Sequence, residues 1–493
     1  MEKQDNLKTR PHWRCRLCQH RSPPDAAICE NPSCGADLAL YGEMILPGST
    51  EDPPVQEHEK KKRGRNIWEE ETDGGTKPPR RRARKGQMAV VLAVFLLAGV
   101  GIGWSLQQGG PADQEQPSGT EEPVDTEPAP EPAAPEEPLP EETPAPDLSW
   151  ENNILREDPA PDSPDAAESP VFGTELRRND VGTVTFLSSL SEMPQESWDV
   201  SAEEDGSVMA WAEYDDSSGL YDLYIGAEGG VAAPEDCSRM FCYYEQLREI
   251  SFNGAFHTDR VTTMEAMFGY CYELTGCDLS GMSAPEVTSM EDMFYNCENL
   301  TEVSTRGMSC ASLLDTSTMF WQCHGLREVD ISGLATENVE DMSGMFGHCT
   351  SLETLDVSFF NTSRVTNMET MFAACKNLTA VDVGAFDTSR VTDMSGMFTG
   401  CERLTELDVG GFDTSGVVDL RAMFYGCEGL SHLDVVNWDT SSAELVDRMF
   451  FGCTNLAMPD FSGWDLSNVT SFEEFAEGTE FSFMILMFDH SGI

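Results

Sequence analysis

A short repeat constrains this chain more than any other feature. The dipeptide Met-Phe opens a recurring phrase at residues 240, 267, 293, 319, 345, 371, 397, 423 and 449, with one interval of 27 residues and all others of 26. It opens the phrase M-F-x-x-C-x-x-L, in which cysteine fills its position in eight of nine copies and Tyr244 replaces it in the first. A fixed period of this length predicts an α/β repeat solenoid in which each repeat forms one coil.

A second phrase, L-x-x-V-D-V-x-x-F-D-T-S-x-V-T-D-M, joins successive copies of the first and is clearest at residues 378–394. Its valines alternate around an aspartate, which predicts a short strand with Val381 and Val383 inward and Asp382 outward. Strands of successive coils should stack into a parallel, leucine-rich-repeat-like sheet. A three-to-four spacing of apolar residues predicts a short helical turn that buries Met394, Met397, Phe398 and Cys401.

The period sets the boundaries of the repeat domain. We expect nine repeats in a solenoid at residues 237–468, and an N-terminal cap at 171–236, where strand-like runs occur without the period. Residues 469–481 keep the register but replace Met by Phe and Cys by Thr, so 469–493 is expected to be a C-terminal cap. Terminal repeats of solenoids are atypical in this way because their outer faces meet solvent.

The repeat resembles the BspA family of leucine-rich-repeat surface proteins, in particular its 26-residue M-F-x-x-C class. The resemblance covers about residues 171–480 and includes a pre-repeat phrase at 198–211. It implies a bacterial cell-surface protein of a kind associated with adhesion to host or neighbouring-cell components. It implies no fixed catalytic residues and no single ligand.

The first 40 residues contain two cysteine pairs, Cys15 with Cys18 and Cys29 with Cys34. Two pairs on tight turns can bring four thiolates to one tetrahedral zinc ion, with His20 as a possible substitute ligand. Because so small a unit cannot bury a core, zinc would supply its folding energy. The segment resembles a zinc ribbon, a family used for protein or nucleic-acid contacts. Unligated cysteines in a disordered tail are the alternative interpretation.

Residues 41–87 form a polar linker with two basic clusters, and 88–106 are 19 residues without a charge. Such a run spans ~28 Å as a helix, enough to cross a bilayer once. The basic flank predicts a cytoplasmic N-terminus and an extracellular repeat domain. A nucleic-acid-binding arm is the alternative for the basic clusters.

Residues 107–170 hold 18 acidic residues and 15 prolines against one arginine. Chain of this composition cannot bury enough apolar surface to fold, so we expect a disordered, extended stalk.

The candidate binding face is the outward column of the sheet. One repeat position carries Asp278, Ser304, Asp330, Asp356, Asp382, Asp408, Asp434 and Asp460. Stacked carboxylates repel one another unless they are solvated or neutralised, so they could recognise a basic partner or calcium. A hydrated, solubilising face is the other interpretation, and calcium is the weaker ligand because no D-x-D-x-D-G loop is present. We take Asp330, Asp356, Asp382, Asp408 and Asp434 as the candidate ligand-binding face.

The sequence argues against an enzyme, because it contains no P-loop, no H-E-x-x-H and no G-x-S-x-G motif. The net charge of −56 argues against nucleic-acid binding along the chain. The function that we expect is binding of an extracellular protein or glycan by a single-pass membrane protein, with a possible cytoplasmic protein partner for the zinc ribbon. A transmembrane sensor ranks second and an envelope hydrolase third. The cysteine column is expected to pack in the core, a thiol or metal ladder being the alternative.

Overall fold

The computed structural model describes residues 149–484 except 162 and 164, together with three short strands near the N-terminus. These strands form one antiparallel sheet in the order β2-β1-β3, with bounds β1 (His12–Cys15), β2 (Arg21–Ser22) and β3 (Gly42–Ile45). Cys15 ends β1, whereas Cys18, Cys29, Cys34 and the predicted membrane helix at 88–106 lie outside the described residues. Within the described residues, no helix is both long and apolar enough for a membrane span.

A cap of mixed strands precedes the repeats. Its elements are η1 (Ser149–Asn152), η2 (Ala166–Glu168), η3 (Arg178–Asp180), β4 (Val181–Leu187), β5 (Trp198–Asp199), β6 (Met209–Asp215), β7 (Leu220–Gly226) and β8 (Val231–Ala232). Strand β4 pairs in parallel with β9 (Glu249–Ser251) of the first repeat, so the cap continues the sheet of the solenoid.

The packed cap begins earlier than the sequence predicted. Leu155 is fully buried, and its N–H donates to the carbonyl of Ala232 at 2.9 Å. The next N–H, that of Arg156, donates to Val200 at 2.9 Å. Residues from 149 onward therefore belong to the cap, although their acidic, proline-rich composition had placed them in the stalk.

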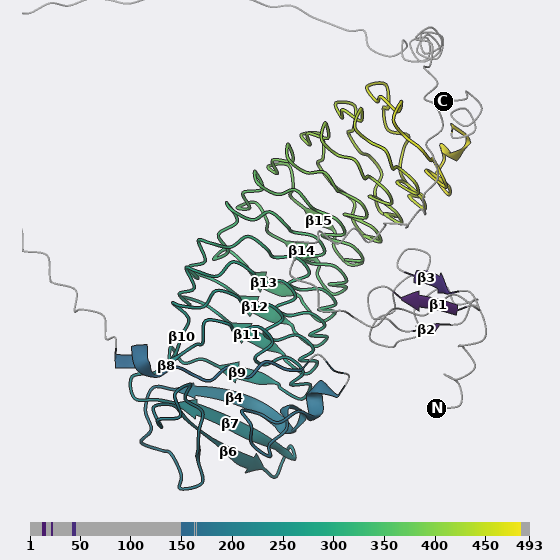
Figure 1. Cartoon of the computed structure of the whole chain (residues 1–493). Helices are drawn as coiled ribbons and strands as arrows, with labels where there is room; N and C mark the ends of the chain where they lie inside the picture. Colours follow the sequence, from purple (N-terminus) through teal and green to yellow (C-terminus); the bar gives the residue numbers. More distant parts are fainter. Residues whose placement is uncertain are drawn as a thin grey trace, which may run out of the picture. The chain divides into compact units, whose positions relative to one another are not determined.

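The repeats form a solenoid, as predicted (Figure 1), and each of the first six coils carries a short strand at the predicted position. In the last three coils this position has no strand, only the Ala380↔Glu406 bridge to the seventh coil. The repeat strands after β9 are β10 (Phe256–His257), β11 (Gly276–Asp278), β12 (Glu302–Ser304), β13 (Glu328–Asp330), β14 (Thr354–Leu355) and β15 (Ala380–Val381). Strand β10 pairs with β8 of the cap. Strands β9, β11, β12 and β13 pair in parallel in this order, as in the Val303↔Val329 pair, and β14 pairs with β15 in a separate two-stranded sheet. Val381 and Val383 are 5% and 0% exposed while Asp382 is exposed, which confirms the predicted faces.

The predicted helical turn is wrong: residues 237–468 contain strands and hydrogen-bonded turns but no helix. In the second coil, the N–H of Phe268 donates to Met293 of the next coil at 2.9 Å, and that of Gly269 closes a tight turn onto Ala266 at 3.0 Å. Tyr270 and Ala266 have φ of 62° and 50°, outside the helical region. Alternate amides thus bond between coils instead of forming the i to i−4 bonds of a helix.

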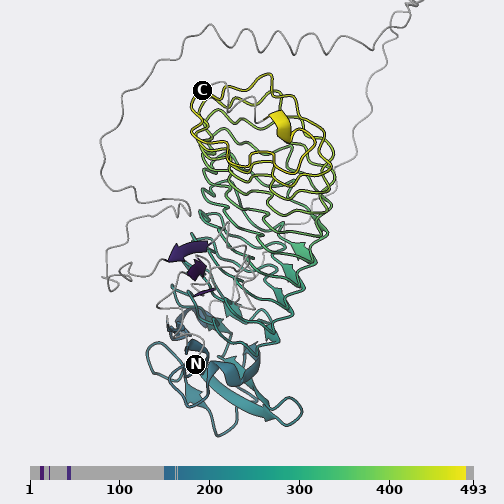
Figure 2. The same ribbon diagram turned by 90° about the vertical axis from the view of Figure 1, so that its right-hand side faces the viewer.

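The inward side of these turns is the core, as predicted. Met394, Met397, Phe398 and Cys401 are all 0% exposed. The coils stack one upon another along the solenoid (Figure 2). The phenylalanines of successive coils stack in the core, with ring centroids 5.3 Å apart for Phe268 and Phe294. The spacing widens to 5.9 Å between Phe346 and Phe372.

The cysteine column has a polar role that the sequence did not reveal. The thiol of Cys375 donates to the carbonyl of Phe346 in the preceding coil at 3.1 Å, and the other repeat cysteines make the equivalent bond. Burial raises the pKa of Cys375 to about 12, so its thiol keeps the proton that it donates. All twelve cysteines within residues 149–484, including Cys237, Cys242, Cys277 and Cys310, are free and buried.

A buried arginine of the cap explains why Tyr244 replaces the first cysteine. The Arg178 guanidinium lies 5.1 Å from the Tyr244 ring centroid and donates to the carbonyl of Met240 at 2.7 Å. It also pairs with Asp158 at 2.8 Å and donates to the Ser169 hydroxyl at 3.0 Å. The first coil packs on the cap and has no repeat before it. The ring of Tyr244 therefore contacts the Arg178 cation of the cap.

The last unit continues the ladder beyond the ninth repeat. The N–H of Phe450 donates to Phe475 at 2.8 Å, and Leu445 bridges Ser471. Thr479, at the cysteine position, is 7% exposed. The element η4 (Ser482–Met484) ends the described chain.

Candidate ligand-binding face

The five candidate aspartates lie in one exposed column on the outer side of the strand position. Each closes a turn, because its carboxylate accepts the N–H of the residue two positions later. The N···O distances are 3.1 Å at Asp330, 3.0 Å at Asp356, 3.2 Å at Asp382, 3.1 Å at Asp408 and 3.3 Å at Asp434. This turn fixes the direction of each carboxylate, a structural role that the sequence analysis did not assign to the column.

Hydroxyl groups assist two of these turns. Ser332 donates its hydroxyl to Asp330 at 2.6 Å, and Ser358 donates its hydroxyl to Asp356 at 2.7 Å. These bonds, together with those from the serine N–H groups, hold the pKa of both carboxyls below the ordinary value. Both aspartates are therefore charged under physiological conditions.

No side chain separates the carboxylates in the second half of the column. A methyl group placed on Gly384 would lie 3.5 Å from an oxygen of Asp382 and 3.5 Å from one of Asp408. Gly410 stands in the same relation to Asp408 and Asp434, at 3.5 Å from each. Within residues 149–484, no ion pair involves any of the five candidate aspartates. Arg306 interacts with Asp330 through charge, but it forms no ion pair with it.

The first half of the same face is hollowed into a groove of about 1240 Å³. The groove runs over β9, β11, β12, β13 and β14, and its lining includes Asp330 and Asp356. Arg248 and Arg327 also line it, so its charge is mixed. The sequence analysis missed both arginines. Both stand three residues before the column position, where four of the other repeats have threonine, and this difference was the available signal.

The geometry does not form a metal centre on this face. Across the described residues, no group of three or more histidine, cysteine, aspartate or glutamate side chains is arranged to hold a metal ion. The column thus presents separate carboxylates in a row, an arrangement suited to an extended cationic surface. The four predicted zinc ligands are not tested by this geometry, since only the backbone of Cys15 is described.

A second exposed column offers a matched comparison. Asp387, Asp413 and Asp439 stand five residues after Asp382, Asp408 and Asp434, and each accepts the N–H of the serine two positions later at 3.0–3.1 Å. The two columns therefore carry the same charge and the same kind of turn, at different positions on the coil.

The comparisons with known proteins identify the repeats. The profile of the family described as "Mycoplasma protein of unknown function, DUF285" matches residues 232–328, 305–381 and 375–487. The three matches together cover more than half of the 493 residues. The chain belongs to this family. The DUF285 matches contain all nine Met-Phe repeats and overlap one another, as expected when each repeat is equivalent to the next.

Other comparisons add little to the DUF285 assignment. None of the curated proteins matches the chain. Seven chains of solved structures match, among them one from the crystal structure of a TLR13–ssRNA13 complex, at 18% identity and a TM-score of 0.23. That match covers 48% of this chain and 35% of the other, so this chain spans about a third of its length. A TM-score this low carries no inference.

Proposed function

We propose that the chain is a membrane-anchored bacterial surface protein whose DUF285 solenoid binds the basic surface of an extracellular protein. The observation that carries the proposal is the column of exposed aspartates without ion-pair partners, which continues from a groove lined by the same face. Complementary charge steers a partner to such a face and fixes its register. An extracellular glycan is the alternative ligand.

The turn at each aspartate supports this function. Because each carboxylate is already held by a backbone N–H, little side-chain freedom is lost when a partner binds. Because the column is exposed, its individual contacts should be modest and sensitive to salt. Affinity would then depend on several carboxylates acting together.

The placement outside the cell is part of the same proposal. Residues 88–106 are proposed to cross the membrane once, and residues 1–40 to bind zinc through Cys15, Cys18, Cys29 and Cys34 in the cytoplasm. The uncharged run, its basic flank and the cysteine spacing support these assignments. The resemblance of the repeat to BspA surface proteins supports a role in adhesion.

Removing charge from the candidate face should weaken binding of a basic probe. We expect the triple variant Asp382→Asn, Asp408→Asn, Asp434→Asn to bind fluorescent oligolysine roughly 10-fold more weakly, at about 0.5 kcal/mol per exposed charge. Asparagine keeps the oxygen that closes each turn, so the fold should persist. Fluorescence anisotropy on the full chain in detergent, at low and physiological salt, measures the change.

The matched control is the triple variant Asp387→Asn, Asp413→Asn, Asp439→Asn, which changes the net charge by the same amount. It should bind oligolysine nearly as well as the wild type. An equal loss in both variants would mean that the probe senses only the overall negative charge, and the assignment of the face would be withdrawn. A glycan array probed with the same proteins tests the alternative ligand.

The proposed topology predicts a protease result. Protease added to intact cells should remove the repeat domain and spare a tag fused to the N-terminus, because the basic cluster at 80–85 would keep that end inside. Immunoblots for the tag and for the repeats make the measurement. Loss of the tag with retention of the repeats would reverse the orientation.

A further inference from the structure

A second ladder joins the coils at the repeat position that Asp393 holds in the sequence V-T-D-M at residues 391–394. Single residues bridge from coil to coil along this ladder, and five consecutive members are Asp315, Asp341, Asn367, Asp393 and Asp419. Unlike the exposed columns, this ladder is half-buried or buried, and Asp419 is 7% exposed. Like charges stacked in a partly buried column need compensation.

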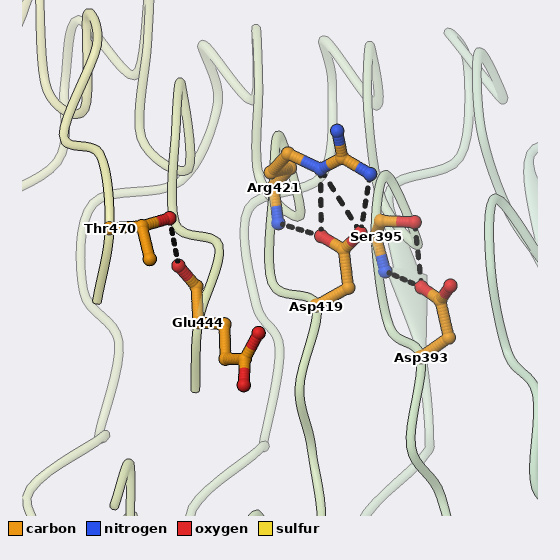
Figure 3. Close-up of polar contacts among 6 residues, drawn as sticks. All are labelled: Asp393, Ser395, Asp419, Arg421, Glu444 and Thr470. Atoms are coloured by element: carbon orange, nitrogen blue, oxygen red, sulfur yellow. Dashed lines mark hydrogen bonds and ion pairs between the residues drawn. The ribbon is translucent and has the colours of Figure 1, made fainter. Parts of the chain in front are cut away.

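Most of these carboxylates are compensated by hydrogen bonds or by an arginine, and Figure 3 shows two of them, Asp393 and Asp419, with their partners. Asp393 accepts the N–H and the hydroxyl of Ser395 at 2.9 and 2.7 Å. Asp419 pairs with Arg421 at 2.6 Å. Asp341 accepts the amide of Asn367 at 3.2 Å.

Glu369 is the exception. It occupies the position that Ser343 and Ser395 hold in the coils on either side, and its residue is only 2% exposed. Its backbone N–H donates to Asn367 at 3.0 Å, but its Oε1 is buried without a hydrogen-bond partner. A buried carboxylate without such compensation is costly when ionised, so the neutral acid is favoured.

The charges around Glu369 come from three other coils. Asp341 lies in the preceding coil, Asp393 in the next, and Asp419 and Arg421 in the one after. Three are negative, and the one positive group is already paired with Asp419. Among the described residues, no group of three or more histidine, cysteine, aspartate or glutamate side chains is arranged to hold a metal ion. The buried Oε1 of Glu369, which has no hydrogen-bond partner, is a site where a proton can bind.

We propose that Glu369 is the proton-binding residue of a pH-sensitive joint in the middle of the solenoid. While it is protonated, the coils that contain residues 341–421 pack as described above. When it loses the proton, a negative charge appears between Asp341 and Asp393 and the joint loosens. The site is separate from the exposed aspartate column and does not depend on the ligand proposed for that column.

The electrostatics give the direction of the pH dependence. Burial, followed by Asp393, Asp419 and Asp341, raises the pKa of Glu369 well above its ordinary value, and burial raises that of Asp393 as well. A carboxyl whose folded pKa exceeds its unfolded pKa stabilises the fold below the unfolded pKa. That contribution is lost as pH rises through the folded pKa. The joint should therefore be tight in mildly acidic solution and weaken toward alkaline pH.

Thermal unfolding of the full chain in detergent at pH 5 and pH 8 tests the proposal. The wild type should lose roughly 3 °C or more in Tm over this interval, and Glu369→Gln, which cannot ionise, should lose distinctly less. At pH 5 the two proteins should melt together, which shows that glutamine fits the site. Glu340→Gln, an exposed change one coil earlier, is the matched control and should retain the pH dependence of the wild type.

Two further readouts locate the effect. Infrared difference spectra at neutral pH should show a protonated carboxyl band that Glu369→Gln removes and Glu340→Gln keeps. Hydrogen exchange should become faster at alkaline pH in residues 341–421 of the wild type than in Glu369→Gln. Equal pH dependence in wild type and Glu369→Gln, or an unchanged carboxyl band, would overturn the proposal.

Discussion

The variant Phe372→Ala should lower the free energy of unfolding by ~3–5 kcal/mol. Phe372 is 0% exposed and stacks between Phe346 and Phe398, at centroid distances of 5.9 and 5.5 Å. Truncation leaves a cavity that neither neighbouring ring can fill without leaving its own stack. Because each coil contacts only its neighbours, the damage should begin in the central repeats and divide unfolding into two transitions. Calorimetry of the full chain measures both effects.

The control for this variant is ten residues away in sequence, at a side chain that faces solvent instead of the core. Asp382→Asn should leave the stability nearly unchanged, or raise it slightly by reducing repulsion with Asp408. Asparagine can still accept the N–H of Gly384, which now bonds the carboxylate at 3.2 Å. A loss as large as that of Phe372→Ala would contradict the assignment of faces and the proposed binding surface with it.

The second large effect is expected where the cap meets the first coil. Replacing Arg178 by methionine should cost ~3–5 kcal/mol, because Asp158 and the carbonyl of Met240 would lose their donor in a buried site. Chemical denaturation of the full chain, followed by circular dichroism, gives the change in unfolding free energy.

The neighbouring residue supplies the matched control. Arg177 pairs with Glu168 at 2.5 Å, but its side chain is 56% exposed. Arg177→Met should therefore cost no more than about 1 kcal/mol. If the two variants were equally damaging, burial of the Arg178 pair would not be the reason for its effect.

The sequence predicted the parts of the fold that repeat. Alternation of Val381, Asp382 and Val383 assigned the strand and its two faces, and the period assigned the coil. The prediction of a helical turn was wrong. Two residues per coil with left-handed backbone conformation also place buried side chains at three-to-four spacing. At Ala266 and Thr370, with φ of 50° and 53°, neither residue is the glycine that normally signals this conformation.

The interactions that occur once were beyond the sequence. Arg178 finds its partners at Asp158, 20 residues before it, and at Met240, 62 residues after it, and no period links these positions. Glu369 occupies a repeat position that is polar in the neighbouring coils, with Ser343 and Ser395. The hydrophobic pattern therefore could not predict that Glu369 is buried. The aspartate column was assigned its outward direction, but its turn-closing bonds depend on backbone geometry that periodicity does not contain.

The cysteine-to-phenylalanine bonds have a consequence for how such a chain changes over generations. Each coil between the first and the last accepts from the coil after it and donates to the coil before it through the same atoms, so gain or loss of 26 residues leaves the remaining contacts intact. Each such event adds or removes one carboxylate of the exposed column. Unequal recombination within the gene can therefore tune the reach and avidity of the surface in steps of one coil, without a new fold being invented.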